Sequence, residues 1–347
     1  MSKMKILFAP AALVLASLAC VTIMGEDVPS QEIPEQGFEP LVEITEPPFE
    51  EYTCPFITDG IVEANLGLAP AQTASDEQMD FGSRAEDNGT YIASYLVSGD
   101  DITDIQLEDV PADLQDEQDD TASHERIWDY YASLIPRQYR ATLSEFWIMT
   151  DGQDNVLAAV AQTYDDPTLW SLEVDIADSY NYDYLTFTLV HEFAHLLTLG
   201  PEQVPPSEAV FNNPEDNDIY LQELSACSNF FPGEGCANPD SYINEFYNAF
   251  WVDTYDEWNE INLEEDDDAY YDQLDDFFFK YEEQFLTDYA VTHPAEDIAE
   301  SFAFFVFSEE TAGGTIAEHK ILFFYQYPEL IDLRNEILNN VCQYYPQ

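Results

Sequence analysis

The 347-residue chain carries 71 acidic and 9 basic side chains, and its formal charge of −62 excludes nucleic acids and anionic membrane surfaces as partners, since both repel it. Hydrophobic residues make up 46% of the chain and aromatic residues 14%, which excludes global disorder and supplies material for a core. The electrostatic field of this negative charge favours cationic substrates or a high-salt medium. An acidic surface that only aids solubility is the simpler interpretation.

Residues 1–19 have the layout of a secretory signal peptide, with a short basic start followed by an apolar stretch at 6–19. This stretch is shorter than the roughly 20 residues that a membrane span needs. Cys20 follows this stretch, in the position of a bacterial lipoprotein cleavage site. We therefore expect lipidation at Cys20, with simple secretion as the alternative. Residues 20–50 are acidic and rich in proline, which predicts a linker between the lipid anchor and the folded region. The protein would then lie on the cell surface, outside the cytoplasm, and contact the membrane only through this anchor.

Four cysteines remain if Cys20 is acylated, and an even number in an exported chain predicts two disulfides. Cys227 and Cys236 bracket a turn-rich segment, which favours the closure of a small loop. Cys54 and Cys342 would then join the start of the folded region to its end. Free, buried thiols are the alternative.

The folded region, residues 51–347, is predicted to be α+β, mostly helical with a small mixed sheet. Its first part contains a segment with helical spacing at 124–135. Strands are expected in four apolar or alternating segments, at 91–97, 143–149, 155–163 and 169–176. Asp151-Gly152 is typical of a hairpin turn, so the second and third strands are expected to pair with each other.

A helix predicted at 182–199 contains His191, Glu192 and His195 in an H-E-x-x-H motif. Histidines four residues apart share one helix face, so both imidazoles can reach one Zn²⁺ ion. Glu192 is placed to take a proton from an attacking water. An amphipathic helix that carries these residues by chance is the alternative, but the flanks are apolar and uncharged, and the chain has only five histidines.

A second helix, which is expected to begin at Pro294, carries Glu296 and Glu300 on one face. Catalytic zinc usually has three protein ligands, and no third histidine follows His195 closely, so a glutamate of this helix is the expected third ligand. Helical geometry alone allows either glutamate. The alternative is that both face solvent, although their helix is otherwise apolar.

These two segments resemble the catalytic domain of the anthrax-lethal-factor-type zinc peptidases, a branch of the Glu-zincins. In that family a tyrosine lies seven residues before the glutamate ligand, and a second glutamate follows four residues after it. Tyr289, Glu296 and Glu300 have this spacing. Thermolysin-type enzymes match less well, because their second segment has an aspartate where this chain has Glu300.

The resemblance implies a zincin-like fold with one catalytic Zn²⁺ ion bound by His191, His195 and Glu296. It further implies that Glu192 is the base, that Tyr289 donates to the transition state, and that Glu300 accepts a hydrogen bond from a ligand histidine. His293 is a second candidate for the donor role of Tyr289.

Residues 201–287 form an insertion between the two ligand helices, where a peptidase would build its substrate cleft or carry a structural cap. The expected function is extracytoplasmic, zinc-dependent hydrolysis of peptide bonds in a peptide or protein substrate. One alternative is a surface-anchored binding or adhesion lipoprotein that keeps the zincin fold without turnover. Another is a halophilic structural protein, which would hold no zinc.

Overall fold

The computed structural model describes residues 54–66, 89–152, 156–264 and 266–346. The expected signal peptide, the lipidation site Cys20 and the linker at 20–50 lie outside the described residues. Within them the chain is α+β and mostly helical with a small mixed sheet, which confirms the predicted class. The strands are β1 (Thr90–Ser98), β2 (Asp101–Leu107), β3 (Leu143–Thr150), β4 (Ala158–Gln162) and β5 (Trp170–Asp175).

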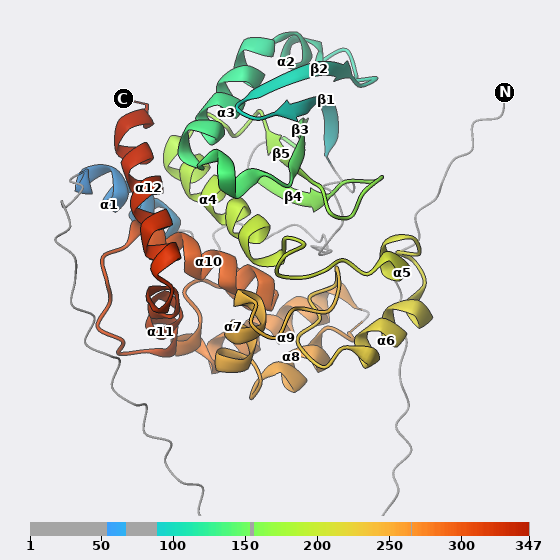
Figure 1. Ribbon diagram of the computed structural model, residues 1–347, viewed down its shortest axis with the longest axis vertical. Coiled ribbons are helices and arrows are strands. Elements are labelled where there is room, and N and C mark those ends of the chain that lie inside the picture. The colour runs from blue at the N-terminus through green and yellow to red at the C-terminus, as the bar shows by residue number, and fades with distance from the viewer. Residues whose placement is uncertain (1–53, 67–88, 153–155, 265, 347) are drawn as a thin grey trace, which may run out of the picture.

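The sheet forms the upper part of the molecule, and most helices lie below it (Figure 1). The α-helices of the described residues are α1 (Pro55–Leu66), α2 (Gln115–Asp119), α3 (Thr121–Leu134), α4 (Tyr182–Leu199), α5 (Glu208–Phe211), α6 (Asn217–Ala226), α7 (Tyr242–Phe250), α8 (Tyr255–Ile261), α9 (Asp267–Lys280), α10 (Pro294–Phe307), α11 (Ile316–Phe323) and α12 (Pro328–Tyr344). Short 3-10 helices are η1 (Arg137–Arg140), η2 (Glu282–Gln284), η3 (Tyr289–Val291) and η4 (Phe324–Gln326).

The strand order is β2-β1-β3-β5-β4, with β3 and β5 parallel and the other pairs antiparallel. The expected hairpin between β3 and β4 is therefore wrong, because β5 lies between them. All six residues of β5 are buried, so this strand takes an interior position, whereas the half-buried β4 forms an edge. The Asp175 carboxylate at the end of β5 accepts the Asp151 N–H at 2.9 Å, which ties the predicted turn to β5 instead.

Helix α4 begins and ends where its sequence signals indicate. The Asn181 side chain accepts the Asp183 N–H at 3.2 Å and caps the first turn. A Cβ atom on Gly200, the residue after the last turn, would lie 2.6 Å from the Leu196 carbonyl oxygen, so this close approach requires glycine. α4 packs against both β4 and α10.

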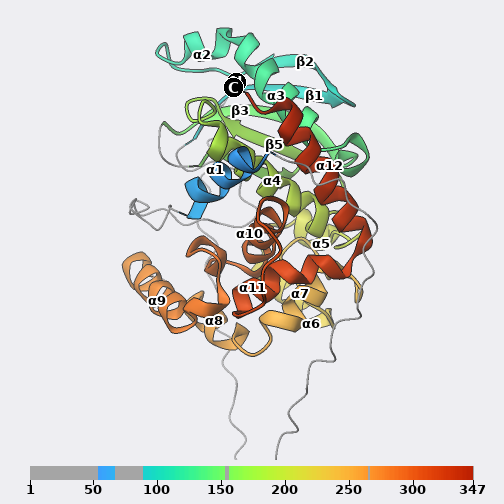
Figure 2. The same ribbon diagram turned by 90° about the vertical axis from the view of Figure 1, so that its left-hand side faces the viewer.

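Helix α10 is the centre of the core, since all fourteen of its residues are buried. Aromatic rings join it to α4, with centroids 5.1 Å apart for Phe187 and Phe304 and 6.0 Å apart for Phe193 and Phe302. Figure 2 shows α1 beside this helix pair, which it contacts on both members, while α12 packs on α3 and α10. The two helices that carry the motif residues are thus held from several sides.

The structure contains both disulfides that the sequence predicts, in the expected pairing. Cys54 at the start of α1 is joined to Cys342 in the last turn of α12, and Cys227 is joined to Cys236 across nine residues. Disulfides are typical of oxidising compartments outside the cytoplasm. Among the described residues, no helix is long and apolar enough to cross a membrane.

We expect the Cys54–Cys342 bond to contribute strongly to stability, because it closes a loop across 288 residues. Replacing both cysteines by alanine should lower the free energy of unfolding by about 2–5 kcal/mol, since the unfolded chain regains conformational entropy. Denaturant titration of the double variant against wild type measures this loss. The matched Cys227→Ala/Cys236→Ala variant should lose less, and an equal or larger loss there would contradict the loop-length account.

Candidate metal centre

His191 and His195 lie on the face of α4 that meets α10, and both imidazoles contact the carboxylate of Glu296. His191 Nε2 lies 2.8 Å from Glu296 Oε2, and His195 Nε2 lies 3.2 Å from Glu296 Oε1. The two Nε2 atoms are 3.2 Å apart. All three side chains are buried, so two imidazole nitrogens and one carboxylate lie together between the helices.

The donor set fits a zinc ion in both chemistry and spacing. Two imidazole nitrogens and a carboxylate are common zinc ligands, and bonds of about 2.0–2.1 Å in a tetrahedral site place ligand atoms about 3.3 Å apart. The two Nε2 atoms are 3.2 Å apart, which is close to this value, and each lies 2.8 or 3.2 Å from a different oxygen of the Glu296 carboxylate. Glu192 also offers an oxygen within 4.8 Å of the histidine nitrogens, which makes His191, Glu192 and His195 a buried cluster that could bind a metal.

Glu300 lies behind His191, on the side away from Glu296. Its Oε1 atom is 2.9 Å from His191 Nδ1, and its Oε2 atom accepts the Thr287 hydroxyl at 2.9 Å. Sequence reasoning placed Glu300 near a ligand histidine but missed Thr287, which has no signal of its own in the sequence. The imidazole of His191 is therefore fixed between two carboxylates, with one on each ring nitrogen.

The charges of this cluster depend on one another. Burial alone would raise the pKa of Glu296, but the charges of His195 and His191 hold it below its usual range, so the carboxylate is ionised. Burial would lower the pKa of His191, but Glu296 and Glu300 raise it well above its usual value. A divalent cation that binds here must therefore displace a proton from the histidine.

Glu192 lies on α4, the helix that packs against the edge strand β4. Burial raises the pKa of Glu192 to about 7, against the opposing charges of His195 and His191. A carboxylate with a pKa near neutral is suited to taking up and returning a proton.

Tyr289 reaches the same cluster from η3. Its ring centroid lies 5.8 Å from that of His191. Burial and the charges of Glu296 and Glu192 raise the pKa of the phenol well above its usual value, so it keeps its proton and can donate. His293, the other candidate donor, caps α10 instead, because its Nδ1 atom accepts the Ala295 N–H at 3.0 Å.

A third acidic residue of α10, Asp297, has a separate partner. Its carboxylate binds the ammonium group of Lys320 from α11 and accepts the Trp251 indole N–H at 2.7 Å. Both Asp297 and Lys320 are fully buried. This ion pair ties α10 to its neighbours beside Glu296, and the sequence did not reveal it.

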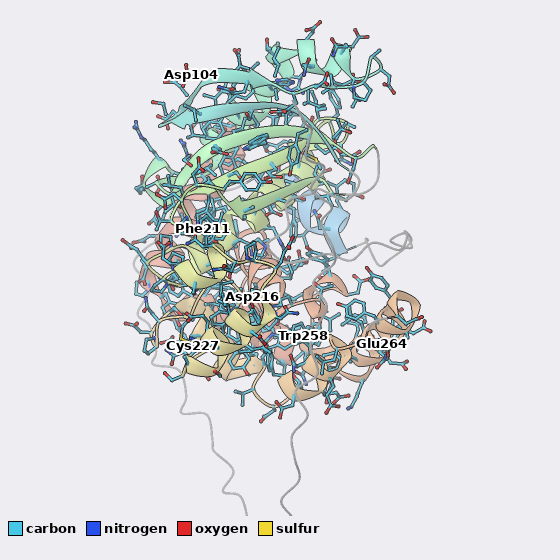
Figure 3. The ribbon with its side chains drawn as sticks, turned by 90° about the vertical axis from the view of Figure 1, so that its right-hand side faces the viewer. Asp104, Phe211, Asp216, Cys227, Trp258 and Glu264 are labelled. Atoms are coloured by element: carbon cyan, nitrogen blue, oxygen red, sulfur yellow. A yellow bond between two sulfur atoms is a disulfide. The ribbon has the colours of Figure 1, made fainter. Side chains whose placement is uncertain are left out.

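The insertion 201–287 contributes the loop that the Cys227–Cys236 disulfide closes. This loop meets the chain that follows α4, because the Ser207 N–H donates to the Glu234 carbonyl at 2.7 Å and Pro206 bridges to Gly235. Figure 3 shows Cys227 in the helical part of the molecule, far from Asp104 on the outer strand β2. Residues 201–287 follow directly after α4 and lie in the helical part of the molecule (Figure 1).

The chain matches no protein-family model, no curated protein and no solved structure. The class of the site therefore comes from its own geometry. The protein has an α+β fold with a buried His-Glu-x-x-His cluster on one helix and a glutamate of a second helix in contact with both histidines. This arrangement is compatible with a metal centre.

Proposed function

We propose that this protein is a zincin-like, zinc-dependent metallopeptidase that acts outside the cytoplasm. One observation carries the proposal: the two Nε2 atoms of the H-E-x-x-H motif and the Glu296 carboxylate lie within 3.2 Å of one another between two buried helices. Buried charged groups are found where they are paired or coordinate a metal, and these three side chains offer ligand atoms for one. The spacing of Tyr289, Glu296 and Glu300 in the sequence supports the same class.

In this proposal each side chain has a separate task. His191, His195 and Glu296 hold the ion, which when bound lowers the pKa of a water molecule and polarises a carbonyl group. Glu192 accepts the proton of the attacking water and returns it to the leaving amine. Tyr289 donates to the oxyanion, a contribution of roughly 10²–10³ in rate for one such donor.

Among the described residues β4 is an edge strand with no strand on its outer side, which supports a peptide as the substrate. Thr163 donates to Leu169 O and Leu157 accepts from Asp175 N, so these odd-numbered positions face β5. Alternation in an antiparallel strand then directs the backbone groups of Ala158, Val160 and Gln162 away from β5. An extended peptide that adds to this edge would pass α4, the helix that carries Glu192, since this helix packs against β4.

The test is cleavage of an unfolded protein and a peptide library by the purified full chain. Activity should require zinc, disappear with a chelator and return when zinc is added back. A protein that holds one zinc ion but cleaves nothing would support the binding or adhesion lipoprotein instead. A protein without zinc would support the halophilic structural protein.

We further propose that Cys20 carries a lipid that anchors the protein to the cell surface. Metabolic labelling with a fatty acid should tag the wild-type protein, and Cys20→Ser should abolish the label and release the protein into the medium. The matched variant Ser17→Ala should keep its label. A label that persists in Cys20→Ser would show that the anchor lies elsewhere.

A further inference from the structure

The hydroxyl group of Thr287 contacts two separate parts of the candidate site. Its Oγ1 atom donates to Glu300 Oε2 at 2.9 Å, and Glu300 Oε1 lies 2.9 Å from His191 Nδ1. The same Oγ1 atom accepts the Ala290 N–H at 3.2 Å. A hydroxyl group has one proton to donate and lone pairs that accept, so one threonine can make both hydrogen bonds.

The second contact of Thr287 belongs to the turn that carries Tyr289. Ala290 is the middle residue of η3, and a threonine oxygen that accepts a backbone N–H three residues further on fixes the start of such a turn. η3 packs against α10, and the Tyr289 ring centroid lies 5.8 Å from that of His191. The position of the tyrosine therefore depends on the same hydroxyl group that holds Glu300.

Both groups that Thr287 contacts are buried, Glu300 on α10 and Ala290 in η3. Without the hydroxyl, the Glu300 carboxylate and the Ala290 N–H would each lose this hydrogen bond away from water, which is unfavourable for both. A shift of the carboxylate would turn the imidazole of His191, and a shift of η3 would move the phenol of Tyr289. One hydroxyl group thus fixes both side chains.

We infer that Thr287 is a positioning residue that couples His191, through Glu300, to the turn that carries Tyr289. This inference rests on the proposed function, in which His191 binds zinc and Tyr289 donates to the oxyanion. The ligand and the donor must keep one relative position in that reaction, because the ion and the phenol act on the same carbonyl oxygen. A threonine that only caps η3 would have no effect on zinc binding.

The zinc affinity of purified full-length variants, measured by competition with a chromophoric chelator, tests the link to the metal. Thr287→Val replaces the hydroxyl by a methyl group and should weaken zinc binding, by less than the about 10–100-fold expected for Glu300→Ala, through which it acts. Thr287→Ser keeps the hydroxyl and should bind zinc as wild type does. In the Glu300→Ala background, Thr287→Val should cause no further loss. Thr287→Ala removes the same hydroxyl and replaces the valine variant if that one does not fold.

The matched control is Thr292→Val, which removes a hydroxyl from the other end of η3. Thr292 Oγ1 donates to the Tyr289 carbonyl oxygen at 2.8 Å. This variant loses a hydrogen bond of the same turn but none to Glu300. Its zinc affinity should stay equal to that of wild type.

Steady-state kinetics test the link to the tyrosine. Thr287→Val should lower kcat by about 10–10²-fold with a smaller change in KM, as expected when a group that acts in the transition state is misplaced. In the Tyr289→Phe background this loss should shrink, because the phenol that Thr287 positions is already absent.

A spectroscopic readout separates positioning from a general structural effect. The chain has five histidines, so ¹⁵N-histidine labelling of the zinc-loaded protein gives few imidazole signals. Thr287→Val should shift the Nδ1–H signal of His191 and leave that of His195 in place.

The inference alone would be overturned if Thr287→Val matched Thr292→Val in zinc affinity and left the His191 signal unchanged. A loss of zinc affinity or of kcat that stays undiminished in the two backgrounds would also overturn it. A wild-type protein that binds zinc but cleaves no peptide would overturn the proposed hydrolysis, and with it the link to the tyrosine. A wild-type protein that binds no zinc would overturn the proposed function and the inference together.

Discussion

Glu192→Gln will retain zinc and lower peptide hydrolysis by about 10²–10⁴-fold, the usual contribution of a general base. The substitution keeps the size of the side chain and leaves His191, His195 and Glu296 unchanged, so the metal still binds. The amide cannot accept the proton of the attacking water, so kcat falls more than KM changes. Metal analysis and steady-state kinetics on the same preparation measure both quantities.

The control for this variant is Glu309→Gln, which makes the same chemical change at an exposed position just after α10. It should keep wild-type activity and zinc content. Full activity in Glu192→Gln would refute the peptidase mechanism. Loss of zinc from Glu192→Gln would show instead that Glu192 is a ligand, which its oxygen within 4.8 Å of the histidine nitrogens makes a real alternative.

Glu296→Ala will remove zinc, whereas Glu300→Ala will weaken zinc binding by about 10–100-fold and still load under excess metal. The difference follows from position. Glu296 contacts the Nε2 atoms of both histidines, while Glu300 contacts only the outer nitrogen of His191. Zinc titration of the two variants compares them directly.

Glu296 and Glu300 lie on the same buried helix, so each alanine variant serves as the control for the effect of the other on the stability of the fold. Thermal unfolding without metal should show that both are folded. If Glu300→Ala loses zinc outright and Glu296→Ala retains it, the third ligand is one helical turn further along α10 than the contacts indicate.

The sequence predicted the parts of the site that depend on local spacing. The H-E-x-x-H motif fixes His191, Glu192 and His195 within one helix, and the bounds of α4 follow from Asn181 and Gly200. Pro294 marks the start of α10, so the common face of its two glutamates could be expected as well. The spacing of residues within one helix predicts which side chains share a face, because neighbouring residues in a helix have a fixed geometry.

The sequence did not predict contacts that depend on how distant segments pack. Asp151-Gly152 indicated a hairpin between β3 and β4. The fully buried β5 is more stable between these two strands than at an edge, and the residues of the turn do not reveal this preference. His124 is a core residue that contacts the Tyr95 hydroxyl and the Glu117 carbonyl oxygen. Thr287 contacts Glu300 from a segment without a motif, so only the folded structure reveals this contact.

Anomalous diffraction at the zinc absorption edge from crystals of the purified protein tests the central claim most directly. The account predicts one strong peak between α4 and α10, about 2.0–2.2 Å from His191 Nε2, His195 Nε2 and a Glu296 carboxylate oxygen. A peak at another place, or no peak in crystals grown with zinc, would contradict it.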